Sequence, residues 1–202
     1  MPEKPEVITV VKSLIPEIVH KEITGCNIYW NNIIAYPSVD DFKKNIVGQV
    51  INDIKTRGKF IVIELDDYSL LIHLRMEGKF FFRKVGDNLN KHEHVEFILD
   101  NDISFRFHDV RKFGKMYLIK KDDTYKVKPL CDLGLEYNDL NLTGNYLLDK
   151  FKNKKLPIGL TLSSTLIQFL LIEVLITFIA SSCPIISLFN FSSNSITFFF
   201  SF

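Results

Sequence analysis

Apolar residues follow helical spacing at the start of the chain and strand-like alternation through its middle. A helix is predicted from Pro5 to about Ile15, because apolar residues recur there at i, i+3, i+4 and i+7. Those apolar residues are Val7, Val10, Val11 and Leu14. Pro16 should end or kink this helix, since proline has no N–H to donate to the preceding turn.

After Gly25, short runs of β-branched and aromatic residues alternate with turn residues. The candidate strands are Val50–Ile54, Phe60–Leu65, Leu70–Leu74, Phe80–Phe82, Val95–Leu99, Ile103–Phe107 and Met116–Ile119. Strict alternation in the sixth run buries its apolar residues and sends Arg106 and His108 to the opposite face. About eight short, closely spaced strands predict an antiparallel β-sandwich or flattened barrel, so the fold class is α+β and mainly β. A second helix is predicted near residues 146–154.

Charged residues end abruptly near residue 157. The whole chain has 25 Lys and Arg against 24 Asp and Glu, so no overall basic excess indicates a nucleic-acid partner. All 25 basic residues lie within 1–157, whereas Glu173 is the only charged side chain of 158–202. We therefore divide the chain into a globular domain, 1–157, and an apolar tail, 158–202.

Three interpretations of the apolar tail remain open. A membrane anchor within about 160–190 needs roughly 20 apolar residues. Leu166–Ala180 supplies 15, with Gln168 and Glu173 among them, and Pro184 interrupts the continuation. The tail could instead pack as part of a core. It could also be the aberrant product of a frameshift or a missed intron, since AT-rich DNA translated out of frame yields uncharged Phe, Ile, Leu and Ser.

The cysteine pattern excludes two common uses of the thiol. Cys26, Cys131 and Cys183 lie far apart and form no Cys-x-x-Cys pair, so neither a disulfide framework nor a zinc site is predicted. A reducing compartment is expected. No secretory signal peptide is expected either, because charged residues interrupt the first apolar positions.

The first six residues place a secondary amine beside two carboxylates. Removal of Met1 would leave Pro2 as the terminal amine, whose pKa near 8 keeps a fraction of it unprotonated at neutral pH. Such an amine can attack a carbon such as a sugar C1′ and form an iminium, with Glu3 and Glu6 moving protons at the sugar. The alternative is an ordinary helix start, where proline and acidic residues both suit the first turn.

Three further segments carry side chains that could contact a partner. Lys59 follows Gly58 at the start of a strand, where a solvated lysine is the alternative. Met76 precedes a glycine turn, from which it could enter a partner or, as methionine more often does, fill the core. His92 and His94 are two residues apart and predicted on one face of a strand, for phosphate or water contact rather than metal binding.

The segment Asp109–Gly114 predicts a loop with two cations and an aromatic residue. Arg111 and Lys112 could contact phosphates while Phe113 inserts between bases. A solvated charged loop with one packed Phe is the alternative.

Taken in order, these segments resemble the N-terminal catalytic domain of the formamidopyrimidine-DNA glycosylases over about residues 1–158. That family begins Pro-Glu-Leu-Pro-Glu-Val after Met, and the corresponding residues here are Pro2-Glu3-Lys4-Pro5-Glu6-Val7. The other matching segments are Arg57-Gly58-Lys59, His73-Leu74-Arg75-Met76, Lys91-His92-Glu93-His94-Val95, Asp109-Val110-Arg111-Lys112-Phe113-Gly114, Cys131-Asp132-Leu133-Gly134-Leu135-Glu136 and Asn153-Lys154-Lys155-Leu156-Pro157-Ile158. The family's helix–two-turn–helix unit and four-cysteine zinc finger are not recognisable after Ile158, so no structural zinc and no other cofactor is expected in this chain.

The resemblance implies a catalytic role for four residues. Pro2 would form a Schiff base with the damaged nucleoside, and Glu3, supported by Glu6, would open the sugar and assist base loss. Lys59 would act as the general acid and base of β-elimination. The implied activity is a base-excision repair DNA glycosylase with AP lyase activity on oxidised purines, namely formamidopyrimidines and 8-oxoguanine.

The resemblance also implies a DNA-binding role for seven residues. Met76, Arg111 and Phe113 would fill the space left by the flipped nucleotide, and the residues that would hold phosphates are His73, His92, Lys112 and Lys154. The expected partner is damaged double-stranded DNA, and the expected state is a monomer in the cytoplasm or nucleoid, or in the nucleus or an organelle of a eukaryote. Loss of the DNA-clamping domain should impair activity. The alternative is a non-catalytic relic of a repair domain, possibly tethered to a membrane through 160–190.

Overall fold

The computed structural model describes residues 2–151, which divide at Leu142 into two units. The unit up to Leu142 holds every strand of the described residues, and the described part of the other unit holds helix α3 (Gly144–Phe151). The second helix predicted near 146–154 is thus confirmed as far as it is described. The tail 158–202 lies outside the described residues, so its three interpretations stay predictions. Within residues 2–151, no helix is both long and apolar enough to span a membrane.

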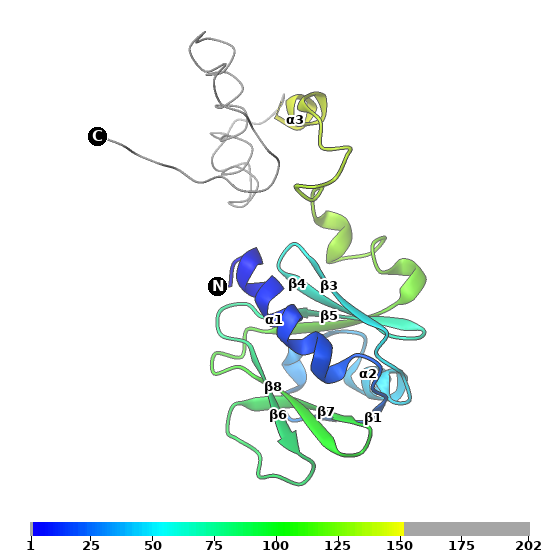
Figure 1. Ribbon diagram of the computed structural model, residues 1–202, viewed down its shortest axis with the longest axis vertical. Coiled ribbons are helices and arrows are strands. Elements are labelled where there is room, and N and C mark those ends of the chain that lie inside the picture. Colours follow the sequence, from blue (N-terminus) through cyan, green and yellow to red (C-terminus); the bar gives the residue numbers. More distant parts are fainter. Residues whose placement is uncertain (1, 152–202) are drawn as a thin grey trace, which may run out of the picture. The chain divides into compact units, whose positions relative to one another are not determined.

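Nine strands form two sheets that enclose one apolar core (Figure 1), which confirms the predicted α+β, mainly β fold. The first sheet has the order β1-β7-β8-β6 and the second has the order β2-β9-β5-β4-β3. The strands are β1 Ile23–Ile28, β2 Ile34–Tyr36, β3 Asp53–Arg57, β4 Phe60–Glu64, β5 Tyr68–His73, β6 Lys79–Lys84, β7 Glu93–Leu99, β8 Ile103–His108 and β9 Lys115–Lys120. All neighbours pair antiparallel except β2 and β9, which are parallel.

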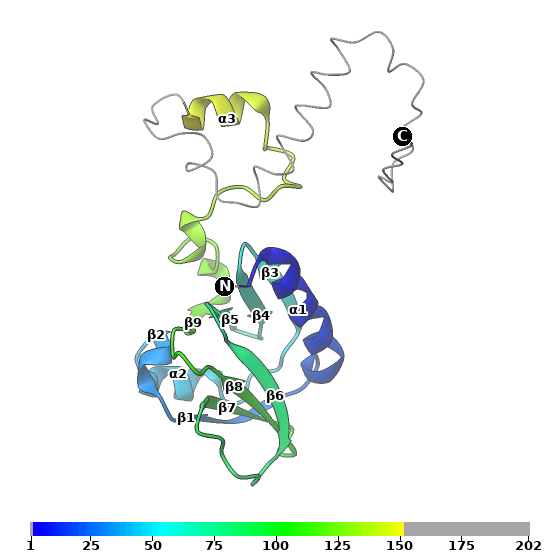
Figure 2. The same ribbon diagram turned by 90° about the vertical axis from the view of Figure 1, so that its left-hand side faces the viewer.

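Helix α1 (Lys4–Ile18) packs along β3 and β4 and carries the N-terminus to their ends (Figure 2). The predicted stop near Ile15 is wrong, because α1 continues through Pro16 for most of another turn. Pro16 lies one turn from the end and removes only its own hydrogen bond. Ile18, with 0% of its surface exposed, gains full burial in return.

Helix α2 (Val39–Ile46) was not predicted from the apolar pattern. Its signal is short: Ser38 caps the helix by accepting a hydrogen bond from the Asp41 N–H at 3.2 Å, and only Phe42 and Ile46 are buried. The short 3-10 helices are η1 (Asn31–Ile33), η2 (Lys121–Asp123) and η3 (Leu130–Asp132).

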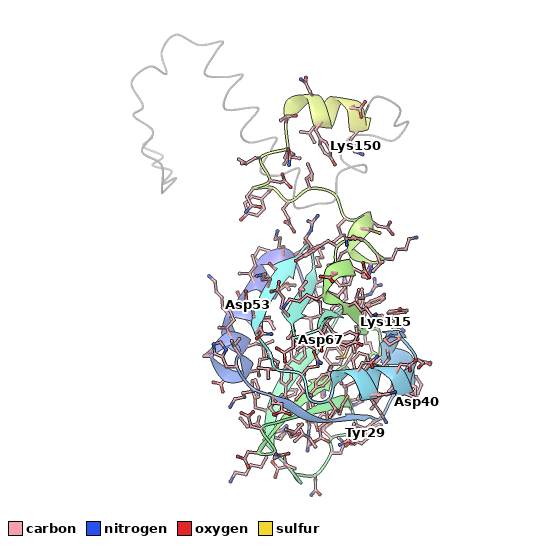
Figure 3. The ribbon with its side chains drawn as sticks, turned by 90° about the vertical axis from the view of Figure 1, so that its right-hand side faces the viewer. Tyr29, Asp40, Asp53, Asp67, Lys115 and Lys150 are labelled. Carbon is pink, nitrogen blue, oxygen red and sulfur yellow. The ribbon has the colours of Figure 1, made fainter. Side chains whose placement is uncertain are left out.

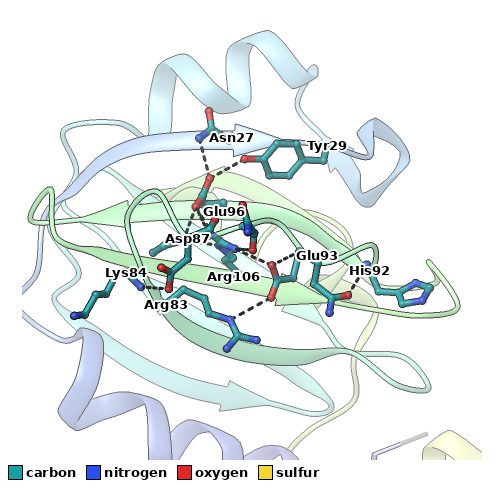
Figure 4. Close-up of polar contacts among 12 residues, drawn as sticks. Asn27, Tyr29, Arg83, Lys84, Asp87, His92, Glu93, Glu96 and Arg106 are labelled. Atoms are coloured by element: carbon teal, nitrogen blue, oxygen red, sulfur yellow. Dashed lines mark hydrogen bonds and ion pairs between the residues drawn. The ribbon is translucent and has the colours of Figure 1, made fainter.

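The outer face of β8 is buried although it carries a charge. Alternation does place Arg106 on the face opposite the apolar core, yet only 2% of its surface is exposed. The segment between β6 and β7 covers it, and the carbonyls of Asp87 and Asn88 accept hydrogen bonds from its guanidinium at 2.8 and 3.1 Å. Figure 4 shows the same guanidinium between Glu93 and Glu96, at 2.9 and 3.1 Å. Because every strong donor has a partner, the buried charge is tolerated.

Candidate active site

Strand register brings the predicted site residues to one end of the second sheet. Phe60 of β4 pairs with His73 of β5, which pairs with Lys115 of β9. Lys59, the turn that holds Met76, and the Asp109–Gly114 loop therefore leave the sheet at the same end. Neighbouring strands lie about 4.8 Å apart, so the β4 and β9 backbones are separated by roughly 10 Å at this row.

At this end of the sheet, the start of α1 meets the start of β4. The Lys59 ammonium lies 2.9 Å from both carboxylate oxygens of Glu3, the N-cap residue of α1. The Glu6 carboxylate accepts a hydrogen bond from the Glu3 N–H at 2.8 Å, which holds the cap in place. Pro2 is half-buried and covalently adjacent to Glu3. The structure thus brings together Pro2, Glu3, Glu6 and Lys59, as the sequence predicts, while their catalytic roles stay predictions.

A carboxylate from a later segment fixes the neighbours of Glu3 and Lys59. Glu136 accepts a hydrogen bond from the Gly58 N–H at 2.7 Å, forms an ion pair with Arg57 at 2.9 Å, and pairs with the ammonium of Lys4. Burial alone would raise the pKa of Glu136, but these three donors outweigh it and the pKa is lowered. Since Lys4 and Gly58 adjoin Glu3 and Lys59 in sequence, Glu136 holds both catalytic candidates in register.

The turn before β6 contacts the loop before β9. The Arg111 guanidinium lies 3.4 Å from the Met76 sulfur and 3.4 Å from a Glu77 carboxylate oxygen. Met76 is 45% exposed and Phe113 is 53% exposed, so both side chains are accessible to a partner. These three predicted base-stack residues therefore present apolar surface and a cation at the end of the sheet.

Asp109 shapes the loop that carries Arg111 and Phe113. Its fully buried carboxylate accepts hydrogen bonds from the Arg111 N–H at 3.0 Å and from the Gly114 N–H at 2.7 Å. Its own N–H donates to the His92 carbonyl at 2.9 Å. The loop is consequently ordered by contacts within the protein, before any partner binds.

His73 is placed at the site but is buried, with 8% of its surface exposed. Its Nδ1 accepts a hydrogen bond from the Arg75 N–H at 3.0 Å. Burial, with Arg75 and Lys59 nearby, lowers its pKa to about 4. The imidazole is thus neutral at physiological pH, and any phosphate contact would use an N–H rather than a positive charge.

The prediction that His92 and His94 share one face of a strand is wrong. His92 lies in the turn before β7, and a β-bulge between Glu93 and Val95 shifts the register that follows. His94 is buried in β7 with Nε2 2.8 Å from the Asp109 carbonyl. No group of three or more possible metal ligands occurs among the residues that the structure describes. The predicted phosphate contact Lys154 lies outside the described residues.

Sequence reasoning did not identify Glu136, Asp109 or Glu77 as parts of the site. Glu136 lies in a segment noted only for its family resemblance, and its partners are 132 and 78 residues away. Asp109 had a usable signal, since an aspartate at the start of a loop commonly accepts nearby backbone N–H groups.

Comparisons with known proteins identify one family. A family model described as the formamidopyrimidine-DNA glycosylase N-terminal domain matches residues 1–116. The formamidopyrimidine-DNA glycosylase of Oceanobacillus iheyensis is 39% identical over 153 residues, which are 75% of this chain and 55% of that protein. The enzyme of the same name from Enterococcus faecalis is 43% identical over 136 residues, 67% of this chain and 49% of that protein. The chain therefore spans about half the length of the curated relatives it matches.

Solved structures show the same likeness. The Lactococcus lactis Fpg in complex with DNA that contains an abasic site superposes with a TM-score of 0.59 and 33% identity, covering 62% of this chain and 46% of that one. A mutant of that protein with tetrahydrofuran-containing DNA gives the same TM-score at 34% identity and the same coverage. With a family model matched across residues 1–116, and with the strands of the described residues arranged to bring Glu3 beside Lys59, the chain belongs to the formamidopyrimidine-DNA glycosylase family.

Proposed function

We propose that this chain is a base-excision repair DNA glycosylase with AP lyase activity on oxidised purines. The observation that carries the proposal is the Glu3–Lys59 ion pair of 2.9 Å beside Pro2. Beside Pro2, the proposed nucleophile, this pair supplies the two groups that exchange protons during the reaction. The Met76–Arg111 contact lies at the same end of the sheet, where it suits replacement of a flipped nucleotide.

The chemistry follows from the positions of these groups. A proton moves from the Lys59 ammonium to the Glu3 carboxylate within the ion pair, which leaves Glu3 as the acid and Lys59 as the base. The Pro2 nitrogen attacks C1′ of the damaged nucleoside as the bond to the base breaks, and the N–H proton of the amine leaves with the base. Glu3 then protonates the ring oxygen of the opening sugar. The resulting iminium draws electrons from C2′. Removal of a C2′ proton, with Lys59 as general base, then expels the 3′ phosphate. The Glu136 contacts to Lys4 and Gly58 support this arrangement by holding Glu3 and Lys59 close together.

The proposed partner is damaged double-stranded DNA bound by a monomer, and the proposed location is with the chromosome, in the cytoplasm or nucleoid. The solved neighbours support DNA as the partner, because they were solved in complex with DNA that contains an abasic site or THF. Met76 and the Arg111–Phe113 sequence support formamidopyrimidines and 8-oxoguanine as the lesions.

Borohydride trapping on duplex DNA with one abasic site tests the proposal. Reduction should link the protein covalently to DNA. The Pro2→Gly variant should form no adduct, because glycine lacks the ring that holds the terminal nitrogen in position. Lys59→Met serves as a second variant, which should trap the adduct but cleave the strand slowly. Mass spectrometry of the trapped protein should show that Met1 is absent. An adduct of equal yield with Pro2→Gly would refute the proposal.

We also propose a weaker form of this function, since the chain spans about half the length of the curated relatives it matches. Because residues 1–157 would supply only one wall of the DNA site, loss of even two or three phosphate contacts lowers affinity and flattens its salt dependence. We expect weak excision of 8-oxoguanine by the purified chain. Complete absence of trapping would favour the non-catalytic alternative, and vigorous excision would show that residues 158–202 do not impair the enzyme.

A further inference from the structure

The Asp109–Gly114 loop is attached to the segment Tyr29–Asn32, which follows β1. His94 joins them: its carbonyl accepts hydrogen bonds from the Tyr29 N–H at 2.8 Å and the Trp30 N–H at 3.3 Å, and its Nε2 lies 2.8 Å from the Asp109 carbonyl. At the far end of the loop, the ammonium of Lys115, labelled in Figure 3, donates to the Asn32 carbonyl. The loop therefore has two anchors on one short segment.

Lys112 makes a third contact with the same segment. Its ammonium lies 4.0 Å from the centroid of the Trp30 ring, well within the range of a cation–π interaction. Trp30 is half-buried and packs against the main core, so one side of the indole is fixed. Lys112 is exposed and has a left-handed backbone conformation, with φ of 58°. An unusual backbone angle and an aromatic surface together direct this side chain.

The charge of Lys112 is left available. Arg111 pairs with Glu77, whereas Lys112 forms no ion pair with any carboxylate among residues 2–151. An ammonium has three N–H donors, and the ring covers only one side of the group. Because Lys112 is exposed, its remaining donors are accessible, which suits an anionic ligand such as a phosphate of a DNA backbone.

We propose that Trp30 is a positioning residue that holds the Lys112 ammonium as a preorganised phosphate-binding subsite. A free lysine side chain loses much of its rotamer freedom when it binds a phosphate. Trp30 removes part of that cost because it restricts Lys112 before DNA arrives. The inference rests on the proposed function, since it takes DNA as the ligand.

Fluorescence tests the contact without DNA. Trp30 is the only tryptophan in the sequence, so its emission reports this site alone. Lys112→Met should shift the Trp30 emission spectrum of the DNA-free chain. Lys91→Met, which removes an exposed lysine from the turn before β7, should leave it unchanged. Identical spectra for the wild type and Lys112→Met would overturn the inference.

DNA binding tests the consequence. With a duplex that carries a stable abasic-site analogue, Lys112→Met should reduce the slope of log affinity against log salt by about one, the value for one lost phosphate contact. Trp30→Leu, which keeps an apolar side chain but removes the π surface, should lower affinity threefold to tenfold. Trp30→Phe should restore most of that loss. Combining Trp30→Leu with Lys112→Met should weaken binding little more than Lys112→Met alone.

Two controls keep the outcomes distinct. Urea unfolding should show that Trp30→Leu remains folded. At protein concentrations that saturate the DNA, this variant should cleave at the wild-type single-turnover rate, because only its affinity is lowered. If Trp30→Leu does not fold, the DNA affinities of Trp30→Phe and Lys112→Met are compared instead. Trp30→Phe should bind more tightly than Lys112→Met, and equal affinities would overturn the inference. If the wild type binds DNA but the losses of affinity from Trp30→Leu and Lys112→Met are fully additive, the inference is overturned and the proposed function is not. Absence of wild-type binding at low salt, with no borohydride adduct, would overturn the proposed function as well.

Discussion

Replacing Arg106 by methionine removes the buried guanidinium that faces Glu93 and Glu96 and should destabilise the protein by about 3–5 kcal/mol. The guanidinium donates to the two carboxylates at 2.9 and 3.1 Å, and to Ser104 Oγ at 2.7 Å. Methionine fills a similar volume, so the cavity contribution is small. The loss comes instead from leaving two carboxylates, 2% and 6% exposed, without their cation.

The pH dependence of this loss has a definite sign. In the wild type, burial alone would raise the pKa of Glu93 and of Glu96, but hydrogen bonds and the Arg106 charge outweigh it and both pKa values are lowered. These carboxylates therefore stabilise the wild type above their unfolded pKa, and that stabilisation is lost as pH falls through the folded pKa. In the variant, burial without the cation should raise both pKa values. Acidification then neutralises the buried charges, and the deficit of the variant should shrink.

Urea unfolding of both proteins from about pH 7 to about pH 4.5 measures the effect. With a urea slope of about 2 kcal/mol per M, a loss of 4 kcal/mol lowers the midpoint by about 2 M. The matched control is Arg83→Met, because Arg83 approaches the same Glu93 at 3.5 Å while its side chain is 42% exposed; it should lose at most about 1 kcal/mol. An Arg106→Met loss below about 1 kcal/mol, or a deficit that does not change with pH, would refute the reasoning.

Three further substitutions test other parts of the molecule. Glu136→Gln should slow single-turnover strand cleavage about tenfold with unchanged DNA affinity, because the charge that holds the neighbours of Glu3 and Lys59 is lost. Glu17→Gln, an exposed control on α1, should have no effect, and equal rates for the wild type and both variants would contradict this prediction. Gly114→Ala should cost about 1–3 kcal/mol in urea unfolding, since a Cβ there would lie 2.6 Å from the Phe107 ring, and wild-type stability would show that the loop simply moves. His73 has a folded pKa of about 4 against an ordinary 6.5, so the unfolded chain takes up a proton first as pH falls, and the wild type should lose stability between these values. The His73→Phe variant should lose less stability over the same range, and parallel plots of stability against pH for the two proteins would exclude this contribution.

The local pattern of the sequence was sufficient for the framework. Strand runs such as Phe60–Leu65 and Ile103–Phe107 appear within one or two residues of their predicted bounds. The first is a short apolar run and the second alternates apolar with polar residues, and both patterns are typical of strands. The Pro2–Glu6 segment and Lys59 were also chosen correctly as neighbours in space, although only their order along the chain and a family resemblance connected them.

Only the tertiary structure decided which charges meet. Alternation alone would place Glu93 and Glu96 on opposite faces of β7, and the bulge between Glu93 and Val95 puts both beside Arg106. Glu136 likewise acts through residues that are 78 and 132 positions away. The spacing of apolar and polar residues along the chain indicates whether a side chain is buried. The partner that compensates a buried charge depends on register, bulges and segment crossings, which arise from the packing of the whole unit.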